Sequence, residues 1–245
     1  LEAGVRGTFR KMTNDYVVSE EDDAGQLIPL LGLDNNFIYE ENINAIYGIL
    51  GDKKNKFSYQ LGLRVEWTDI ETILEETNQS NPRNYSNLFP SAHFTYDLGE
   101  ADAVQLSYSR RVRRPVYRDL SPFITFSDNR NFFSGNPDLN PEFSDVFELG
   151  HIKYFEKGSI ASTVYYRWTD DFIAGLRSVD NQGLSNTRPE NLNYEEAYGL
   201  EFSSSYSPYR WWKLDLNLNL FSSKVDGSNI NPDFTNSTTS WFVRK

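Results

Sequence analysis

The feature that most constrains this chain is a two-residue alternation of apolar and polar side chains. It is clearest over residues 212–221, where leucine occupies every second position. The leucines are Leu214, Leu216, Leu218 and Leu220, and between them stand Lys213, Asp215, Asn217 and Asn219. Successive side chains of a β-strand point to opposite faces, so this stretch predicts a strand with one apolar face. Because the same period recurs along most of the chain, the sequence predicts an all-β protein.

Residues 57–70 repeat the alternation over a longer span, with charge on one side only. The apolar side carries Phe57, Tyr59, Leu61, Leu63, Val65 and Trp67, and the polar side carries Ser58, Gln60, Arg64, Glu66 and Thr68. The apolar sets predicted for three other strands are Leu1, Ala3, Val5 and Phe9; Ile43, Ala45, Tyr47 and Ile49; and Leu88, Ala92, Phe94, Tyr96 and Leu98. Further strands are expected at 104–112, 146–155, 160–169, 194–206 and from about residue 238. We expect a β-bulge in 146–155, since Phe147 and Leu149 fall on one face and Ile152 and Tyr154 on the other.

The connections between these strands alternate in length. Short polar turns lie at 51–56, 99–102, 156–158 and 207–211. Long connectors lie at 12–36, 71–86, 114–141, 170–193 and 222–237. A meander with this rhythm has all tight turns at one end and all long loops at the other, as in outer-membrane barrels. We therefore expect residues 1–245 to form one segment, an antiparallel up-and-down meander of about ten long strands that is part of a transmembrane β-barrel.

Hydropathy is compatible with that expectation. The mean hydropathy is −0.60 and no run of about 18 apolar residues occurs, which excludes a transmembrane helix. A β-barrel needs no such run, since only every second strand residue meets lipid. Strands of about 10 to 14 residues, at ~3.3 Å each, are long enough to cross the hydrocarbon layer. Aromatic residues also gather near strand ends, as interfacial girdles require: Phe57, Tyr59, Trp67, Phe89, Tyr166, Trp168, Trp211 and Trp212.

Composition narrows the function classes. The formal charge of −11 argues against a nucleic-acid partner, and the absence of cysteine removes disulfides, thiolate metal sites and thiol nucleophiles. No nucleophile elbow, His-Glu-X-X-His motif or phosphate-binding glycine loop is present, so we expect no enzyme and no cofactor. His93 and His151 lack further ligands in sequence, so no metal site is predicted. Acidic residues at 20–23, and Asp226 with Asp233, could bind calcium, but they lack EF-hand spacing and are interpreted as solvated loop charge.

The middle of the chain resembles a known family. The run NLFPSAHFTYDLGEADAVQLSYSRRVRRPVYRDLSPF (87–123), followed by GNPDLNPEFSDVFELG (135–150), is similar to the barrel of TonB-dependent outer-membrane receptors and, more narrowly, to the outer-membrane β-barrel protein family. FSYQLGLRVEWTDI (57–70) resembles the strand that precedes this block, and the resemblance covers most of residues 41–220. The segment 136–142 is the most diagnostic element. Its two prolines force extended predecessors, so we interpret it as a rigid exit from a loop without a ligand role.

The resemblance implies a receptor of ~22 strands with an N-terminal plug, energised through a segment that contacts the TonB complex. No plug, coupling segment or aromatic-ended closing strand is recognisable here. We therefore expect the chain to be a fragment of a larger receptor in the outer membrane of a Gram-negative bacterium. Its partners would be outer-membrane lipid, a small-molecule or oligosaccharide ligand, and the TonB complex through parts that this chain lacks.

Two groups of residues are candidates for ligand binding. The arginines at positions 110, 111, 113, 114 and 118 would steer an anionic ligand, bind lipopolysaccharide phosphates, or pair with carboxylates such as Glu66. The connector 114–141 mixes aromatic and amide side chains, which suit a sugar or siderophore but also suit packing of the loop on itself. The predicted ligand-binding residues are Arg111, Arg113, Tyr117, Asp128, Asn129, Arg130, Asn131, Phe132 and Phe133. Alternation places Arg110 on the lipid face, where its stem can snorkel.

The residues predicted to face the lumen are Gln60, Arg64, Glu66, His93, Gln105, Arg111, Arg113, Asp215, Asn217 and Asn219. The favoured function is the barrel wall and extracellular loops of a TonB-dependent receptor for nutrient uptake. A soluble all-β carbohydrate-binding module is the alternative, although its strands are usually shorter. A third interpretation is a complete ten-stranded outer-membrane barrel with an adhesive or enzymatic role.

Overall fold

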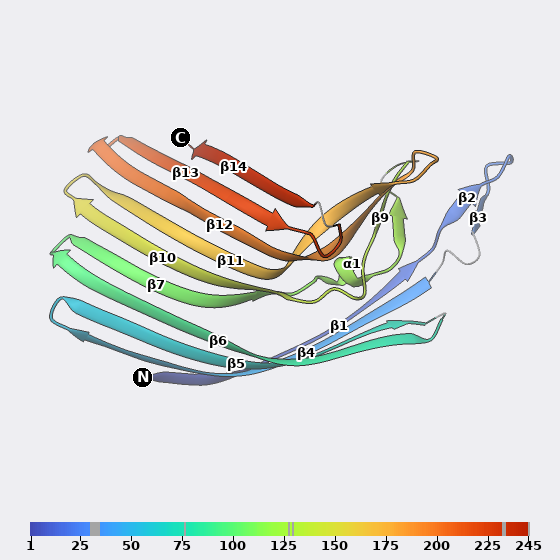
Figure 1. The fold of residues 1–245 in the computed structure, drawn as a ribbon, viewed down its shortest axis with the longest axis horizontal. Coiled ribbons are helices and arrows are strands. Elements are labelled where there is room, and N and C mark those ends of the chain that lie inside the picture. The colour runs from blue at the N-terminus through green and yellow to red at the C-terminus, as the bar shows by residue number, and fades with distance from the viewer. Residues whose placement is uncertain (30–34, 76, 127, 129, 232–233, 245) are drawn as a thin grey trace.

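The computed structural model describes residues 1–29, 35–75, 77–126, 128, 130–231 and 234–244. Ten long strands form one curved antiparallel wall (Figure 1), and each pairs with the next along the chain. The wall strands are β1 (Glu2–Tyr16), β4 (Asn35–Lys54), β5 (Phe57–Leu74), β6 (Gln79–Gly99), β7 (Asp102–Arg113), β10 (Glu142–Phe155), β11 (Gly158–Val179), β12 (Ser185–Tyr209), β13 (Trp212–Asp226) and β14 (Thr235–Arg244). This confirms the predicted all-β meander of about ten long strands.

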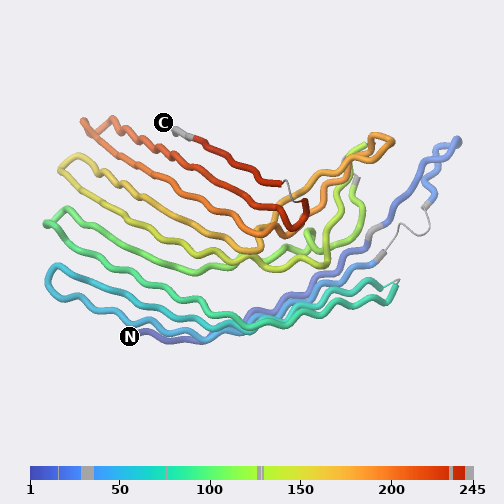
Figure 2. Tube along the Cα trace, in the orientation of Figure 1, coloured from blue at the N-terminus to red at the C-terminus, as the bar shows by residue number. Residues whose placement is uncertain are grey.

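Five short elements lie in the connections. They are β2 (Ser19–Glu21), β3 (Leu27–Pro29), α1 (Tyr117–Leu120), β8 (Ile124–Phe126) and β9 (Asn131–Ser134). β2 and β3 pair only with each other, whereas β9 pairs with β8 and runs parallel to β12. Tight turns gather at one end of the wall and the larger connections at the other (Figure 2). No helix in the described ranges is long and apolar enough to cross a membrane.

The predicted alternation becomes two faces of the wall. We call the inner face the one against which α1 and its connector pack, and the outer face the opposite one. The register places Ala45, Glu66 and Asn87 side by side on the inner face. The outer face is a field of exposed apolar side chains that includes Leu63, Leu88, Leu106, Leu149, Val164 and Leu216. A water-soluble sheet would cover such a field, whereas a barrel wall presents it to lipid.

Three details of the sequence-based assignment are wrong. Ile43, Ala45, Tyr47 and Ile49 were expected on the apolar side, yet Ala45 and Tyr47 stand opposite Glu66 and Arg64 on the inner face, and the exposed Ile46 takes the outer position. β10 contains no bulge, because its ladders to β7 and β11 run without a register shift. Phe89 is buried rather than interfacial, and its ring stacks on Phe143 at 6.4 Å between centroids. In each case apolar residues also occupy the inner face, so side-chain type alone does not define the phase.

Two predicted loops are largely strand. β5 and β6 stay paired as far as Leu74 and Gln79, and β11 and β12 as far as Val179 and Ser185, so 71–86 and 170–193 are mostly the upper parts of two tall hairpins. Polar residues interrupt the apolar series on both faces there, which removes a regular alternation, whereas the backbone ladder needs no apolar face. The predicted connectors 12–36 and 222–237 are also shortened by strand at their ends, since β1 reaches Tyr16, β4 starts at Asn35, β13 reaches Asp226 and β14 starts at Thr235.

The two tall hairpins are separated, and connector 114–141 fills the space between them. β6 pairs with β7 only from Ser91 onward, and β11 extends past the last residue that pairs with β10. The buried cluster that joins connector and wall consists of Phe37, Tyr39, Ile70, Leu120, Leu139 and Ile173. Apolar packing thus attaches this connector to the inner face, between the flanks of the wall (Figure 1).

Candidate functional site at the connector end of the inner face

The connector ends in residues 136–142, which we call the bridging segment. Pro137 and Pro141 provide no N–H group and hold the chain extended. The side-chain oxygen of Asn136 accepts the N–H of Asp138 at 3.0 Å and fixes the first turn of the segment. Just before it, Gly135 crosses α1 so closely that a Cβ would lie 2.2 Å from the carbonyl oxygen of Ser121. Only glycine fits there, because the obstacle is backbone.

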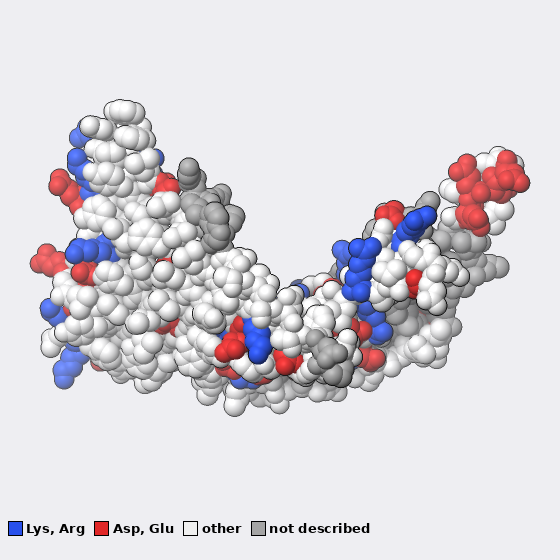
Figure 3. Space-filling view, turned by 45° about the horizontal axis from the view of Figure 1, so that its top comes forward, with Lys and Arg blue, Asp and Glu red and all other residues white. Residues whose placement is uncertain are grey.

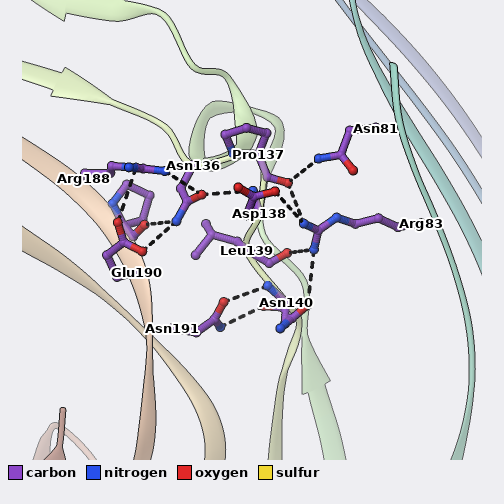
Figure 4. Close-up of polar contacts among 11 residues, drawn as sticks. Asn81, Arg83, Asn136, Pro137, Asp138, Leu139, Asn140, Arg188, Glu190 and Asn191 are labelled. Atoms are coloured by element: carbon purple, nitrogen blue, oxygen red, sulfur yellow. Dashed lines mark hydrogen bonds and ion pairs between the residues drawn. The ribbon is translucent and has the colours of Figure 1, made fainter. Parts of the chain in front are cut away.

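Side chains of both tall hairpins hold the bridging segment (Figure 4). From β6, Arg83 donates to the carbonyl oxygens of Pro137, at 2.8 Å, and Leu139, and Asn81 also donates to Pro137, at 3.0 Å. From β12, Arg188 donates to Asn136 at 2.9 Å. The residues of β6 and β12 that hold residues 136–140 are Asn81 and Arg83 on β6 and Arg188, Pro189, Glu190 and Asn191 on β12.

Through these contacts the bridging segment connects β6 and β12, two strands that do not pair with each other. Asn140 and Asn191 exchange two hydrogen bonds, of 2.8 and 3.1 Å, on the β12 side. Buried Asn136 donates to Glu190 at 2.8 Å. The backbone carbonyls of 137 and 139 point to β6, while the side chain of Asn136 and the backbone of Asn140 reach β12, so one short segment fixes the spacing of the two hairpins. The segment predicted to be a rigid exit from the loop therefore also connects the two tall hairpins.

Glu142 ends the segment and connects it to the arginine cluster. Its carboxylate accepts two hydrogen bonds from Arg113, at 3.1 and 3.2 Å, and the N–H of Ile173 at 2.8 Å. Glu142 is 6% exposed, whereas the side chain of Arg113 is 57% exposed, so a guanidinium that reaches solvent compensates a buried carboxylate. Arg113, predicted to bind ligand, is thus half of an ion pair that anchors the start of β10.

The other arginines of the cluster have different partners. Arg110 lies on the outer face, as predicted, and pairs with Asp145 at 2.7 Å. Arg114 pairs with Glu66, and Arg118 covers the ring of Phe133 at 4.4 Å from its centroid. Arg111 is exposed and donates only to Ser109, at 3.2 Å, among the residues that the structure describes. The carboxylate pairing that the sequence suggested therefore holds for Arg110, Arg113 and Arg114.

Several of the predicted ligand-binding residues of the connector have partners within the protein. Tyr117 packs on Phe37 with 6.3 Å between ring centroids, and Asn131 binds both Asp128 and Arg177. Asp128 accepts the N–H groups of Arg130 and Asn131, and these bonds hold the pKa of its carboxyl below its ordinary value. Phe132 and Phe133 lie on β9, and Asn129 lies outside the described residues. Ligand binding by these residues stays a prediction.

A second site lies lower on the inner face, where β1, β4 and β5 run side by side. Glu66 is 6% exposed and accepts hydrogen bonds from both Arg64 and Arg114. Arg114 also donates to Tyr85 and Thr68, each at 3.2 Å. The hollow beside this network has a volume of about 430 Å³. We call it the arginine recess; its charged lining is Arg6, Arg10, Glu41, Arg64, Glu66 and Arg114.

The residues predicted for the lumen all lie on the inner face by register. The pairings that show this join Gln60 to His93, Thr95 to Gln105, Arg113 to Glu142, Arg111 to Ser144, and Ser203 and Ser205 to Asn217 and Asp215; Asn219 stands opposite Glu201. His151 lies on the outer face, 2.6 Å from Asp102, so the two histidines do not share a site. Of the calcium candidates, Asp226 accepts from Asn193 and Ser228, and Asp233 lies outside the described residues. That these inner-face positions line a water-filled lumen stays a prediction.

Sequence reasoning missed most of the residues that hold the connector. Arg83, Arg188 and Asn191 lie in stretches expected to be loop, where no alternation indicates a face. Arg83 does share the odd-numbered phase of Phe89, Ser91 and His93, which is the inner phase of β6. Extending that phase backward would have found it.

An antiparallel wall with an exposed apolar outer face, a polar inner face and a braced connector defines part of an outer-membrane β-barrel. The chain belongs to the outer membrane protein beta-barrel family, whose model matches residues 1–245. The protein is thus located in the outer membrane of a Gram-negative bacterium. A comparison with curated protein sequences gives no match.

Solved structures show the same fold. The copper transporter OprC is 16% identical with a TM-score of 0.63, over 92% of this chain and 36% of OprC. The ferric-catecholate import receptor Fiu of E. coli K12 is 14% identical with a TM-score of 0.64, over 91% of this chain and 35% of Fiu. The ferric yersiniabactin uptake receptor FyuA of Yersinia pestis is 15% identical with a TM-score of 0.61, over 91% of this chain and 32% of FyuA.

The chain therefore spans about a third of the length of these receptors. The matches confirm, at the level of fold, the expected resemblance to the barrel of TonB-dependent outer-membrane receptors. The family match also decides against the soluble carbohydrate-binding module, since the family consists of outer-membrane β-barrels.

Proposed function

We propose that this chain is the barrel wall and extracellular connector region of a receptor that takes up a scarce nutrient. The proposal rests on the bridging segment that connects the two tall hairpins. An open pore needs no structure folded across its wall, whereas a receptor needs side chains held at fixed positions where a solute arrives. Residues 136–142 hold the connector in this way, through hydrogen bonds to both hairpins.

The similar structures support uptake rather than adhesion or catalysis. They are a copper transporter and two receptors for iron chelates, according to their names. A siderophore, a glycan or a similar solute would bind at the connector end, through Arg111, Arg130, Asn131 and the aromatic side chains of 117–133. Energy would come from the TonB complex through parts of the protein outside residues 1–245.

The test is a deletion in the full protein, expressed in a host that lacks its own iron receptors. We would replace residues 123–134 by a short Gly-Ser linker and measure uptake of a panel of radiolabelled ferric siderophores. The proposal predicts that uptake of one chelate is lost while the barrel still shows a heat-shifted band on a gel. Uptake should also stop when a protonophore collapses the energy source.

The matched control is the removal of residues 19–28, the β2–β3 hairpin. Among the residues that the structure describes, this hairpin pairs with no strand of the wall. It carries Glu20 and Glu21 on β2 and Asp22 and Asp23 in its turn, and it lies at the rim of the hollow in Figure 3. Its loss should leave uptake intact. A deletion of 123–134 that leaves the uptake of every transported chelate unchanged would contradict the proposed role of the connector.

A further inference from the structure

The arginine recess concentrates positive charge in an otherwise acidic chain. The whole sequence has a formal charge of −11. The recess, in contrast, is lined by four arginines and two glutamates, which gives 4 − 2 = +2. Its members come from β1, β4, β5 and the residue after β7, so the fold and not the sequence gathers them. An excess of guanidinium groups in a hollow raises the local concentration of anions.

The two carboxylates of the recess are already engaged. Glu66 is shared by Arg64 and Arg114, so one negative charge faces two positive ones. Glu41 is 5% exposed and accepts the hydroxyl of Tyr39 at 3.0 Å. The guanidinium of Arg10 lies 3.8 Å from Glu41, beyond hydrogen-bond distance. The carboxylates therefore leave hydrogen-bond donors of the arginines unused.

Arg6 and Arg10 are the donors that remain. Both are exposed, and the side chain of Arg10 is 55% accessible. Arg6 forms no ion pair with any residue in the described part of the chain. The register puts Arg6 opposite Ala45 and Arg10 opposite Glu41, so both point to the inner face with Thr8 between them. Residues four apart on a strand stand about 13 Å apart, which spaces Arg6 and Arg10 along a solute rather than around a single ion.

We propose that the arginine recess binds a solute that carries carboxylate or phosphate groups. Arginine forks match these planar or tetrahedral oxyanions with paired, charge-assisted hydrogen bonds. The volume of about 430 Å³ suits part of a small organic molecule. Arg6 and Arg10 are the primary contacts, and the Glu66 network fixes Arg64 and Arg114 as the far wall. The inference deepens the proposed function, on which it rests, because it gives the chemical class of the solute.

The experiment measures binding of citrate, as a tricarboxylate probe, to the detergent-solubilised full protein by isothermal titration calorimetry. The double variant Arg6→Gln, Arg10→Gln should bind citrate about tenfold more weakly or worse, because it loses charge-assisted bonds. Glu41→Gln should bind it more tightly, since a repelling carboxylate is removed while Tyr39 keeps an acceptor. A folding defect would not produce this gain.

The matched control is Arg210→Gln. It removes the same charge from an exposed turn at the opposite end of the wall, so the affinity should stay unchanged. The absence of any heat of binding for the unsubstituted protein at about 10 mM citrate would overturn the inference. The same result is expected when a carboxylate of the protein itself occupies the recess, and then too the recess binds no solute. Equal affinity of the double variant and the unsubstituted protein would overturn it too. Because binding is measured without transport, these results are independent of the uptake test.

Discussion

At the scale of single residues, the inner face depends on carboxylates that sequence spacing does not pair. Glu66 alternates in phase with Arg64, which places both on one face. Its second partner, Arg114, is 48 positions away and reaches it only because the chain turns inward after β7. Removing one partner of such a buried network leaves a charge without compensation.

Glu66→Gln should therefore lower the free energy of unfolding by about 3 kcal/mol, since two guanidinium groups would face each other across a neutral amide. Urea unfolding of the protein in micelles, followed by tryptophan fluorescence, measures this change. The control is Asp97→Asn, which breaks an exposed pair with Lys53 and should cost less than about 1 kcal/mol. Equal effects of the two substitutions would show that the Glu66 network adds no more than a surface pair.

At the scale of elements, the tall hairpins and the bridging segment form one mechanical unit. β11–β12 rises beyond its neighbours β10 and β13, β6 extends beyond its pairing with β7, and the segment 136–142 spans the distance between the two hairpins. Strands that no neighbour supports open locally more easily than the rest of a sheet. The bridging segment is therefore expected to limit the mobility of the connector.

Arg83→Gln should loosen the attachment of the segment to β6, because it removes three of the four hydrogen bonds that β6 donates to residues 137–140. Hydrogen exchange of the backbone at 115–141 should become about tenfold faster, while the exchange of β13 stays unchanged. Asp138→Asn is the control, since that side chain is 81% exposed and its carboxylate lies 3.7 Å from the guanidinium of Arg83, beyond hydrogen-bond distance. Unchanged exchange in Arg83→Gln would mean that Asn81 and β12 are sufficient to hold the segment.

The two faces of one strand provide a second prediction at this scale. Leu216 and Asn217 are neighbours on β13, and the register places them on the outer and inner face. Leu216→Arg should destabilise the folded protein in lipid by about 2–4 kcal/mol, because the charge meets hydrocarbon. Asn217→Arg, its matched control, should change stability far less. Unfolding in lipid vesicles compares the two, and a reversed order would refute the assignment of the faces.

At the scale of the whole molecule, the outer face and the strand edges determine behaviour in water. Exposed apolar side chains cover the outer face, and β1 and β14 end the order of the sheet. Unpaired edges and apolar fields both promote association.

Residues 1–245 expressed alone should therefore aggregate in plain buffer and become monodisperse only in detergent, with a heat-modifiable band. Size-exclusion chromatography with light scattering, with and without micelles, measures this. A β-sandwich that buries its apolar face, kept in plain buffer, is the comparison. A monodisperse monomer without detergent would contradict the membrane assignment.

The sequence by itself determined the strands, their order and most of their faces. Residues such as Leu214 to Leu220 report the phase directly, since lipid accepts apolar side chains on one face and water selects polar ones on the other. Ile43 and Ala45 were misassigned because the inner face also holds apolar residues. The hairpin extensions at 71–86 and 170–193 were missed because polar residues interrupt the apolar series on both of their faces.

Only the tertiary structure determined the contacts of the bridging segment, the Glu66 network and the arginine recess. These sites join β6 to β12 and β1 to the residue after β7, and the partners lie tens of residues apart in the sequence. Side-chain alternation is a local property of one strand. Which side chains meet across the inner face depends on the register, the curvature and the path of a connector through the space between two hairpins.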